Sequence, residues 1–77
     1  MTILIVDDHP IVLKGIHALL ASSFAEARIM DAAGLEEAEQ MLNRHKVDIL
    51  ITDLDLNGES GSMLIEHVRD VQPATQV

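Results

Sequence analysis

The chain has 77 residues, no cysteine and a net charge of −8, with thirteen acidic against five basic residues. The lack of cysteine excludes a disulfide framework, a thiolate metal site and a cysteine nucleophile. The negative charge and the single aromatic residue, Phe24, argue against direct binding to nucleic acid or to an anionic membrane. The apolar runs are far shorter than a membrane span, and the N-terminus does not resemble a signal peptide. We therefore expect one soluble, cytoplasmic domain.

The first predicted elements are a short strand and a helix. Residues 2–6 (TILIV) are apolar throughout, which predicts a strand buried on both faces. Pro10 follows the stretch DDH and suits the first turn of a helix that runs to about Ser22. Apolar residues recur in this helix at helical spacing, which predicts a buried face. The residues of that face are Val12, Ile16, Leu19 and Leu20.

The same alternation then occurs twice more. Residues 27–32 predict a second, weaker strand, and residues 34–45 a helix whose acidic residues lie in its first half, where the helix dipole favours them. Residues 47–52 predict a third strand, residues 62–71 a third helix, and residues 75–77 the start of a fourth strand. The expected buried positions are Leu35, Ala38, Met41 and Leu42 in the second helix and Leu64, Ile65, Val68 and Val71 in the third.

The order βαβαβα predicts an α/β fold with a parallel sheet and right-handed crossovers. Asp7 and Asp8 follow the first strand and Asp53 follows the third, so their strand ends lie at the same edge of the sheet. With strand order 2-1-3 these three carboxylates converge. Like charges raise each other's pKa unless a cation intervenes, and Mg²⁺ is the divalent ion that best suits such oxygen ligands. Helix capping is an equally good explanation for Asp8, and His9 is interpreted as a capping-turn residue.

The stretch DLDLNGESG after the third strand allows two readings of its acidic residues. ILITDLDLN resembles the first motif of the haloacid-dehalogenase-like phosphatases, which implies Asp53 as the nucleophile and Asp55 as the acid/base. In that family the motif normally ends the first strand of the domain, and a Thr or Val usually stands at the position of Asn57. This reading is the weaker alternative.

The second reading explains more of the chain. ILIVDDHPIVLKGI and VDILITDLDLNGESGSMLIEHVRDVQP together resemble the receiver domain of bacterial two-component response regulators. The closest resemblance is to the branch whose members usually carry a C-terminal helix-turn-helix. It covers the whole chain and implies the α/β, flavodoxin-like (CheY-like) fold with strand order 2-1-3. It also implies a role in transcription regulation rather than an enzyme.

The resemblance assigns functional roles residue by residue. Asp53 would be the phosphoacceptor, Asp7 and Asp8 the acidic pair that binds Mg²⁺, and Asp55 a further metal ligand through its backbone carbonyl. The phosphoryl donor would be a phosphohistidine on a sensor histidine kinase. Gly61 matches the glycine with which the third helix of the family begins.

Two departures from the family pattern affect these expectations. Leu56-Asn57 stands where the family usually has Met-Pro. A complete receiver has five strands and five helices, with a switch Ser or Thr and a Lys that bind the phosphoryl group, and neither position is present here. We expect residues 1–77 to be the N-terminal part of a receiver, without an output domain and with little switching.

The third predicted strand would also have an open edge at residues 49–51, which invites pairing with another chain. A homodimer or larger assembly is therefore expected. The alternative function is a non-switching receiver remnant that acts as a dimerisation or interaction module.

Overall fold

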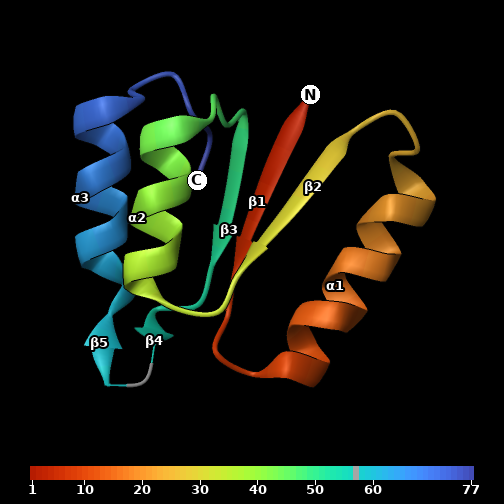
Figure 1. Ribbon diagram of the computed structural model, residues 1–77, viewed down its shortest axis with the longest axis horizontal. Coiled ribbons are helices and arrows are strands. Elements are labelled where there is room, and N and C mark those ends of the chain that lie inside the picture. Colours follow the sequence, from red (N-terminus) through yellow and green to blue (C-terminus); the bar gives the residue numbers. More distant parts are fainter. Residues whose placement is uncertain (57) are drawn as a thin grey trace.

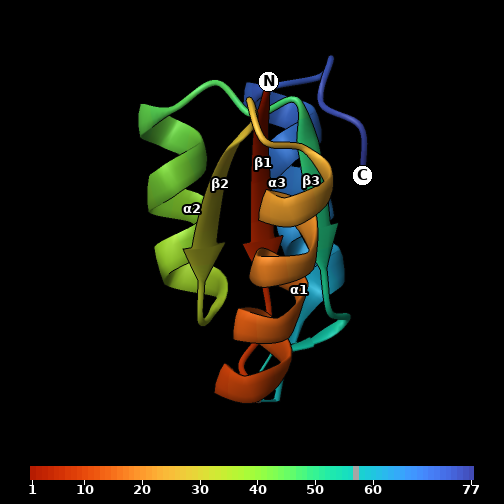
Figure 2. The same ribbon diagram turned by 90° about the vertical axis from the view of Figure 1, so that its right-hand side faces the viewer.

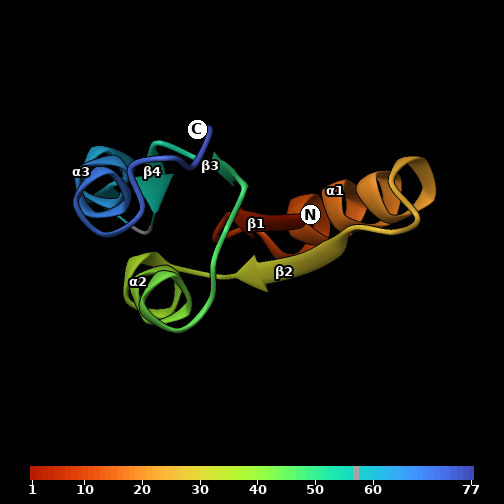
Figure 3. The same ribbon diagram turned by 90° about the horizontal axis from the view of Figure 1, so that it is seen from above.

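The computed structural model describes residues 1–56 and 58–77, which form three layers (Figure 1). A parallel sheet of order β2-β1-β3 lies in the middle, with α1 on one side and α2 and α3 on the other, as Figures 2 and 3 show. The bounds of these elements are β1 Thr2–Val6, α1 Pro10–Ser23, β2 Arg28–Ala32, α2 Leu35–Arg44, β3 Ile49–Thr52 and α3 Gly61–Val71. This is the predicted flavodoxin-like arrangement. No helix in the described part of the chain is long and apolar enough to cross a membrane.

The register of the strands brings their carboxyl ends to one edge of the sheet. β1 pairs in parallel with β2 from Thr2 opposite Arg28, and with β3 from Ile3 opposite Ile49. The last pair, Val6 opposite Thr52, lies directly before the predicted acidic residues. β1 is therefore the middle strand, and the residues that follow β1 and β3 are neighbours.

The main core lies between the sheet and the pair α2 and α3. Side chains alternate along a strand, so Leu4 and Val6 join this core while Ile3 and Ile5 point toward α1 and are equally buried. The predicted faces of α2 and α3 are confirmed for five fully buried residues: Leu35, Ala38, Leu42, Leu64 and Val68. Met41 and Ile65 are half-buried. The prediction for Val71 is wrong, because this residue at the end of α3 is 45% exposed.

Helix α1 has no fully buried residue. It packs chiefly against β1 and β2, and this leaves its outer side uncovered (Figure 3). The predicted buried face is wrong for Val12 and Leu19, which are 46% and 67% exposed, while Ile16 and Leu20 are half-buried. Ile11 is 87% exposed. The apolar surface of α1 is thus only partly used within the chain.

The residues after α3 return to the outer edge of β3. The Leu50 N–H donates to the Gln76 carbonyl at 2.7 Å, and the Gln76 N–H donates to the Asp48 carbonyl at 2.9 Å. The predicted fourth strand therefore begins as a single parallel bridge between Ile49 and Gln76. Beyond this bridge, no other described segment pairs with the outer edge of β3, and Ile51 is 37% exposed.

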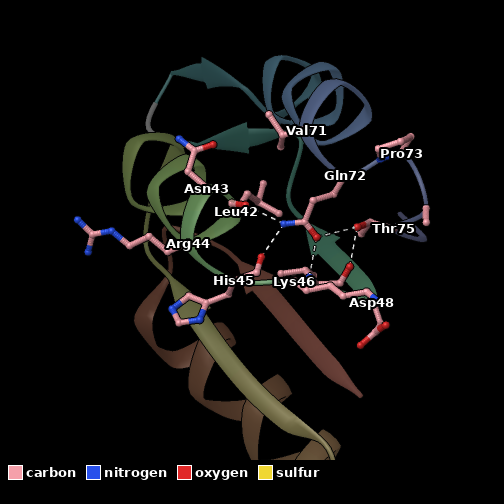
Figure 4. A pocket seen from close by; sticks show the side chains of 12 residues that line it. Leu42, Asn43, Arg44, His45, Lys46, Asp48, Val71, Gln72, Pro73 and Thr75 are labelled. Atoms are coloured by element: carbon pink, nitrogen blue, oxygen red, sulfur yellow. Dashed lines mark hydrogen bonds between the residues drawn. The ribbon is translucent and has the colours of Figure 1, made fainter.

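One side chain, that of Gln72, joins the ends of three elements (Figure 4). Its Nε2 donates to the carbonyls of Leu42 and His45 at 2.7 and 2.6 Å, and its Oε1 accepts from the Val47 N–H at 2.7 Å. The Thr75 hydroxyl donates to the Val47 carbonyl at 2.6 Å. These bonds tie the end of α2 to the start of β3 and to the turn after α3, at the edge of the sheet opposite the acidic residues.

A small antiparallel hairpin, formed by β4 (Asp55–Leu56) and β5 (Glu59–Ser60), was not predicted. Leu56 is 1% exposed and belongs to the core, which fixes the hairpin to the body of the domain. Gly58 has φ +82°, a left-handed conformation that glycine adopts readily. Asn57, which departs from the family's proline position, lies outside the described residues.

Candidate functional site

Two strands deliver Asp7 and Asp53 to the same place. Asp7 directly follows β1 and Asp53 directly follows β3. Both backbones continue the sheet for one more residue, because the Asp7 N–H donates to the Ala32 carbonyl at 3.1 Å and the Asp53 N–H to the Val6 carbonyl at 3.0 Å. The positions of these two aspartates are therefore set by the sheet itself rather than by a free loop.

Four residues form what we call the acidic cluster: Asp7, Asp8, His9 and Asp53. Each offers one ligand atom, and these atoms all lie within 4.8 Å of one another. Asp7 is 9% exposed, Asp8 and Asp53 are half-buried, and the His9 side chain is 65% exposed. The predicted convergence of the three carboxylates is thus present, at the carboxyl edge of the parallel sheet where α/β folds bind ligands.

His9 is the member of the cluster that sequence reasoning missed. It occupies the N-cap of α1, but its side chain makes no capping bond. Its backbone N–H donates to Asp7 Oδ1 at 2.8 Å, and its ring Nδ1 lies 2.9 Å from the same oxygen and 3.0 Å from Asp8 Oδ1. The signal in the sequence was the unbroken order Asp-Asp-His at a strand end, which keeps all three residues on one short loop.

These contacts lower the pKa of Asp7 and raise the pKa of His9. The pKa of Asp7 lies below its ordinary value of 3.8, chiefly because the His9 N–H donates to the carboxylate, although burial opposes the shift. The pKa of His9 is raised above 6.5, first by the hydrogen bond with Asp7 and then by the charge of Asp8. Within the cluster one imidazole faces three carboxylates, so the site attracts cations.

Asp55 lies beside Asp53 but outside the acidic cluster. The Asp55 N–H donates to Asp53 Oδ1 at 3.1 Å, which orients the Asp53 carboxylate. The Asp55 carboxylate is exposed and accepts from the Gly58 N–H at 3.2 Å, so it stabilises the hairpin turn. The phosphatase reading needs this carboxylate as an acid/base beside the nucleophile, and the hairpin gives it a structural use instead.

Gly61 begins α3 and lies against the loop that carries Asp53. Its N–H donates to the Leu54 carbonyl at 2.9 Å. A Cβ atom at this position would clash with the Asp53 carbonyl oxygen and would lie 2.8 Å from Leu54 Cα. Ser60 caps the helix by accepting from the Ser62 N–H at 3.2 Å. The glycine thus allows α3 to pack tightly against the loop that carries Asp53.

The donor set of the cluster fits a hard divalent cation. Mg²⁺ prefers oxygen ligands, commonly takes one or two carboxylates and retains water for further contacts. Asp7, Asp8 and Asp53 supply such oxygens. The side chains of Asp7 and Asp8 are each 12% exposed, whereas Asp53 is half-buried and the His9 side chain is 65% exposed, which leaves access from solvent. The residues present are therefore suited to hold Mg²⁺ next to the Asp53 carboxylate.

Comparison with known proteins gives consistent matches. The model of the response regulator receiver domain family matches residues 3–77. The glycerol metabolism activator of Pseudomonas putida is 30% identical over 76 residues, which cover 97% of this chain and 34% of that protein. The oxygen regulatory protein NreC of Staphylococcus haemolyticus is 35% identical over 78 residues, which cover 100% and 36%. The chain thus spans about a third of the length of such relatives.

Solved structures agree with the sequence matches. A response regulator protein from Burkholderia pseudomallei, with a phosphorylated aspartic acid, a calcium ion and citrate, superposes with a TM-score of 0.77 at 25% identity. The match covers 96% of this chain and 42% of that one. The receiver domain of the hybrid histidine kinase CckA superposes with a TM-score of 0.76 at 26% identity, covering 97% and 69%.

Proposed function

Because the chain belongs to the response regulator receiver domain family, we propose that it accepts a phosphoryl group on Asp53 in an Mg²⁺-dependent reaction of two-component signal transduction. The observation that carries this proposal is the convergence of Asp7, Asp8 and Asp53 at the carboxyl edge of the sheet. The phosphorylated aspartic acid and the calcium ion of the similar Burkholderia pseudomallei protein add support. The donor would be the phosphohistidine of a sensor histidine kinase.

The proposed reaction is a phosphoryl transfer between two side chains. An oxygen of Asp53 attacks the phosphorus, the phosphorus–nitrogen bond of the donor breaks, and its electron pair returns to the imidazole of the kinase. The Asp55 N–H, 3.1 Å from Asp53 Oδ1, orients the attacking carboxylate. Asp7 and Asp8, with the backbone carbonyl of Asp55, would hold Mg²⁺. The bound ion would offset the charge of the transferred group.

We propose that the chain receives the signal and does not itself produce the response. It would act as the receiver part of a transcription regulator, consistent with relatives such as the transcriptional activator protein ExaE of Pseudomonas putida, 32% identical over 77 residues. It would be a stoichiometric phosphoprotein in the cytoplasm rather than an enzyme that turns over a substrate. Its net charge of −8 disfavours nucleic acid and membranes as direct ligands.

Phosphorylation by a small-molecule donor tests this function. After incubation with acetyl phosphate and Mg²⁺, intact mass spectrometry is expected to show one added phosphoryl group, and none when Mg²⁺ is removed by chelation. Asp53→Asn is expected to abolish the adduct, because an amide is not a competent nucleophile. Asp55→Asn is the matched control and is expected to keep it, since the Asp55 carboxylate serves the hairpin turn. An unmodified wild-type chain, or an adduct that persists in Asp53→Asn, would contradict the proposal.

The alternative of an interaction module is favoured by a specific observation. Ile11 and Leu19 on α1 are 87% and 67% exposed, and Ile51 on the outer strand is 37% exposed. Exposed apolar side chains and an incompletely paired strand both favour association with another chain. We propose that the chain forms a homodimer or a larger assembly that covers the outer edge of β3.

Sedimentation at micromolar concentration tests the association. The wild-type chain is expected to sediment as a dimer or larger species, and Ile51→Lys is expected to shift it toward the monomer by placing a charge at the strand edge. Glu26→Lys is the control, because Glu26 is exposed and lies before β2, and this variant is expected to leave the association unchanged. A well-folded wild-type monomer at these concentrations would rule out the interaction module.

A further inference from the structure

We propose that His9 supplies a nitrogen ligand to the divalent cation of the acidic cluster, so that the site favours first-row transition ions such as Co²⁺ and Zn²⁺ over Mg²⁺. This inference rests on the proposed function, because it adds a residue to the same metal site. It changes the expected ion preference of that site from a purely oxygen-based one to a mixed one.

The placement of the imidazole is the first argument. Nδ1 of His9 lies 2.9 Å from Asp7 Oδ1 and 3.0 Å from Asp8 Oδ1, so it faces both carboxylates at once. The Asp53 carboxylate completes the group, since the four ligand atoms lie within 4.8 Å of one another. The ring therefore points into the cluster and not toward the solvent alone.

The spacing of the donor atoms is the second argument. In an octahedral site with metal–ligand bonds of about 2.1 Å, neighbouring ligand atoms lie about 3.0 Å apart. The distances of 2.9 and 3.0 Å from Nδ1 to the two oxygens have this value. A cation that replaced the proton between the ring and the carboxylates would therefore find Nδ1 at the spacing of a neighbouring ligand from each of these two oxygens.

The backbone around His9 is the third argument. Its N–H donates to Asp7 Oδ1 at 2.8 Å, and its backbone is extended, with φ −102° and ψ 106°. The residue before a proline is restricted to such extended conformations, so Pro10 limits the positions that His9 can take. The imidazole is thus attached to a rigid turn next to two metal ligands, which lowers the entropy that it loses on coordination.

The chemistry of the ligands determines which ions benefit. Mg²⁺ binds oxygen and gains little from an imidazole, whereas Co²⁺ and Zn²⁺ bind imidazole nitrogen well and lie higher in the Irving–Williams order. Three carboxylates alone would discriminate less between these ions. A fourth ligand of the nitrogen type therefore raises the affinity for the transition ions selectively.

The other histidines do not share this arrangement. His17 pairs with Asp31 at 2.7 Å, and His67 lies 3.6 Å from Glu39. In the part of the chain that the structure describes, the acidic cluster is the one group of three or more His, Asp or Glu residues whose ligand atoms lie close enough to hold a metal ion. His17, which faces a single carboxylate, is thus a matched control for the imidazole of His9.

Binding of Co²⁺, followed by its visible absorption and by calorimetry, tests the inference on the full chain. His9→Ala is expected to lower the Co²⁺ affinity by about tenfold or more, the size of effect that residues supporting a metal site commonly have, and to change the Mg²⁺ affinity less than about threefold. His9→Gln, which keeps a polar side chain, is expected to behave in the same way. His17→Gln is expected to change neither affinity. In spectra recorded with Zn²⁺, the ring ¹⁵N signals of His9 are expected to shift before those of His17.

The outcomes separate this inference from the proposed function. If the wild-type chain binds Mg²⁺ and loses it in Asp53→Asn, but His9→Ala lowers the affinities for Co²⁺ and Mg²⁺ equally or not at all, the inference is overturned and the proposed function stands. If the wild-type chain binds neither ion at the cluster, both are overturned. Selective loss of Co²⁺ in both His9 variants supports the inference.

Discussion

Gly61→Ala is expected to lower the free energy of unfolding by about 2 kcal/mol, within the range of 1–3 kcal/mol typical of overpacked sites. The new methyl group would clash with the Asp53 carbonyl oxygen and lie 2.8 Å from Leu54 Cα. Both are backbone atoms, so no side-chain rotation can relieve the contact. Either α3 or the loop that carries Asp53 has to move.

The same substitution is expected to impair the acidic cluster. If the loop moves, the Asp53 carboxylate is displaced from Asp7 and Asp8, and the Mg²⁺ affinity and the yield of phosphorylation both fall. Urea denaturation followed by circular dichroism measures the stability, and intact mass after acetyl phosphate treatment measures the yield.

Gly15→Ala is the control for this experiment. Gly15 lies within α1, and a Cβ there would meet nothing within 4 Å. Alanine in a helix is favoured over glycine by roughly 0.5–1 kcal/mol, so this variant is expected to be more stable than the wild type. Equal stability changes in the two variants would show that Gly61 is not under the steric restriction described here.

Gln72→Leu is expected to lower the free energy of unfolding by about 3 kcal/mol, because it leaves backbone groups without hydrogen bonds, at about 1–3 kcal/mol for each fully buried group. The affected groups are the carbonyls of Leu42 and His45 and the N–H of Val47 (Figure 4). Leucine has a similar volume but can neither donate nor accept. A small domain with marginal stability would be largely unfolded by this change.

Gln40→Leu is the matched control for Gln72→Leu. Gln40 lies on the exposed side of α2, and exposed substitutions usually change stability by about 0.5 kcal/mol or less. Urea midpoints of the two variants, measured side by side, test the role of Gln72. If Gln72→Leu unfolds at the wild-type midpoint, the hydrogen bonds around Gln72 do not contribute to stability.

The order of the strands and helices and the convergence of the aspartates could be predicted from the sequence. Apolar strands that end in acid, such as residues 2–6 before Asp7, carry a strong local pattern, and the parallel geometry then determines where the strand ends meet. The register of β1 with β3 confirmed this expectation. The predicted buried faces of α2 and α3 were also largely confirmed, because both helices have one clear apolar stripe.

Features that depend on distant contacts could not be predicted. In α1 apolar residues occur on several sides, so periodicity alone could not show that Val12 and Leu19 remain exposed. β4 and β5 have two residues each, too few for an alternating pattern to be recognised. The role of Gln72 depends on carbonyls that the fold brings to it from α2, and no local signal marks it.

The central place of β1 in the sheet has a consequence for how the chain reaches its native state. β1 precedes both of its partner strands in the chain, since Thr2 pairs with Arg28 and Ile3 with Ile49. Pairings between such distant segments slow folding, because a long loop has to close before the contact forms. During synthesis β1 emerges before β2 and β3, so both of its edges are paired only after β3 has emerged, and its apolar side chains are not fully covered until then.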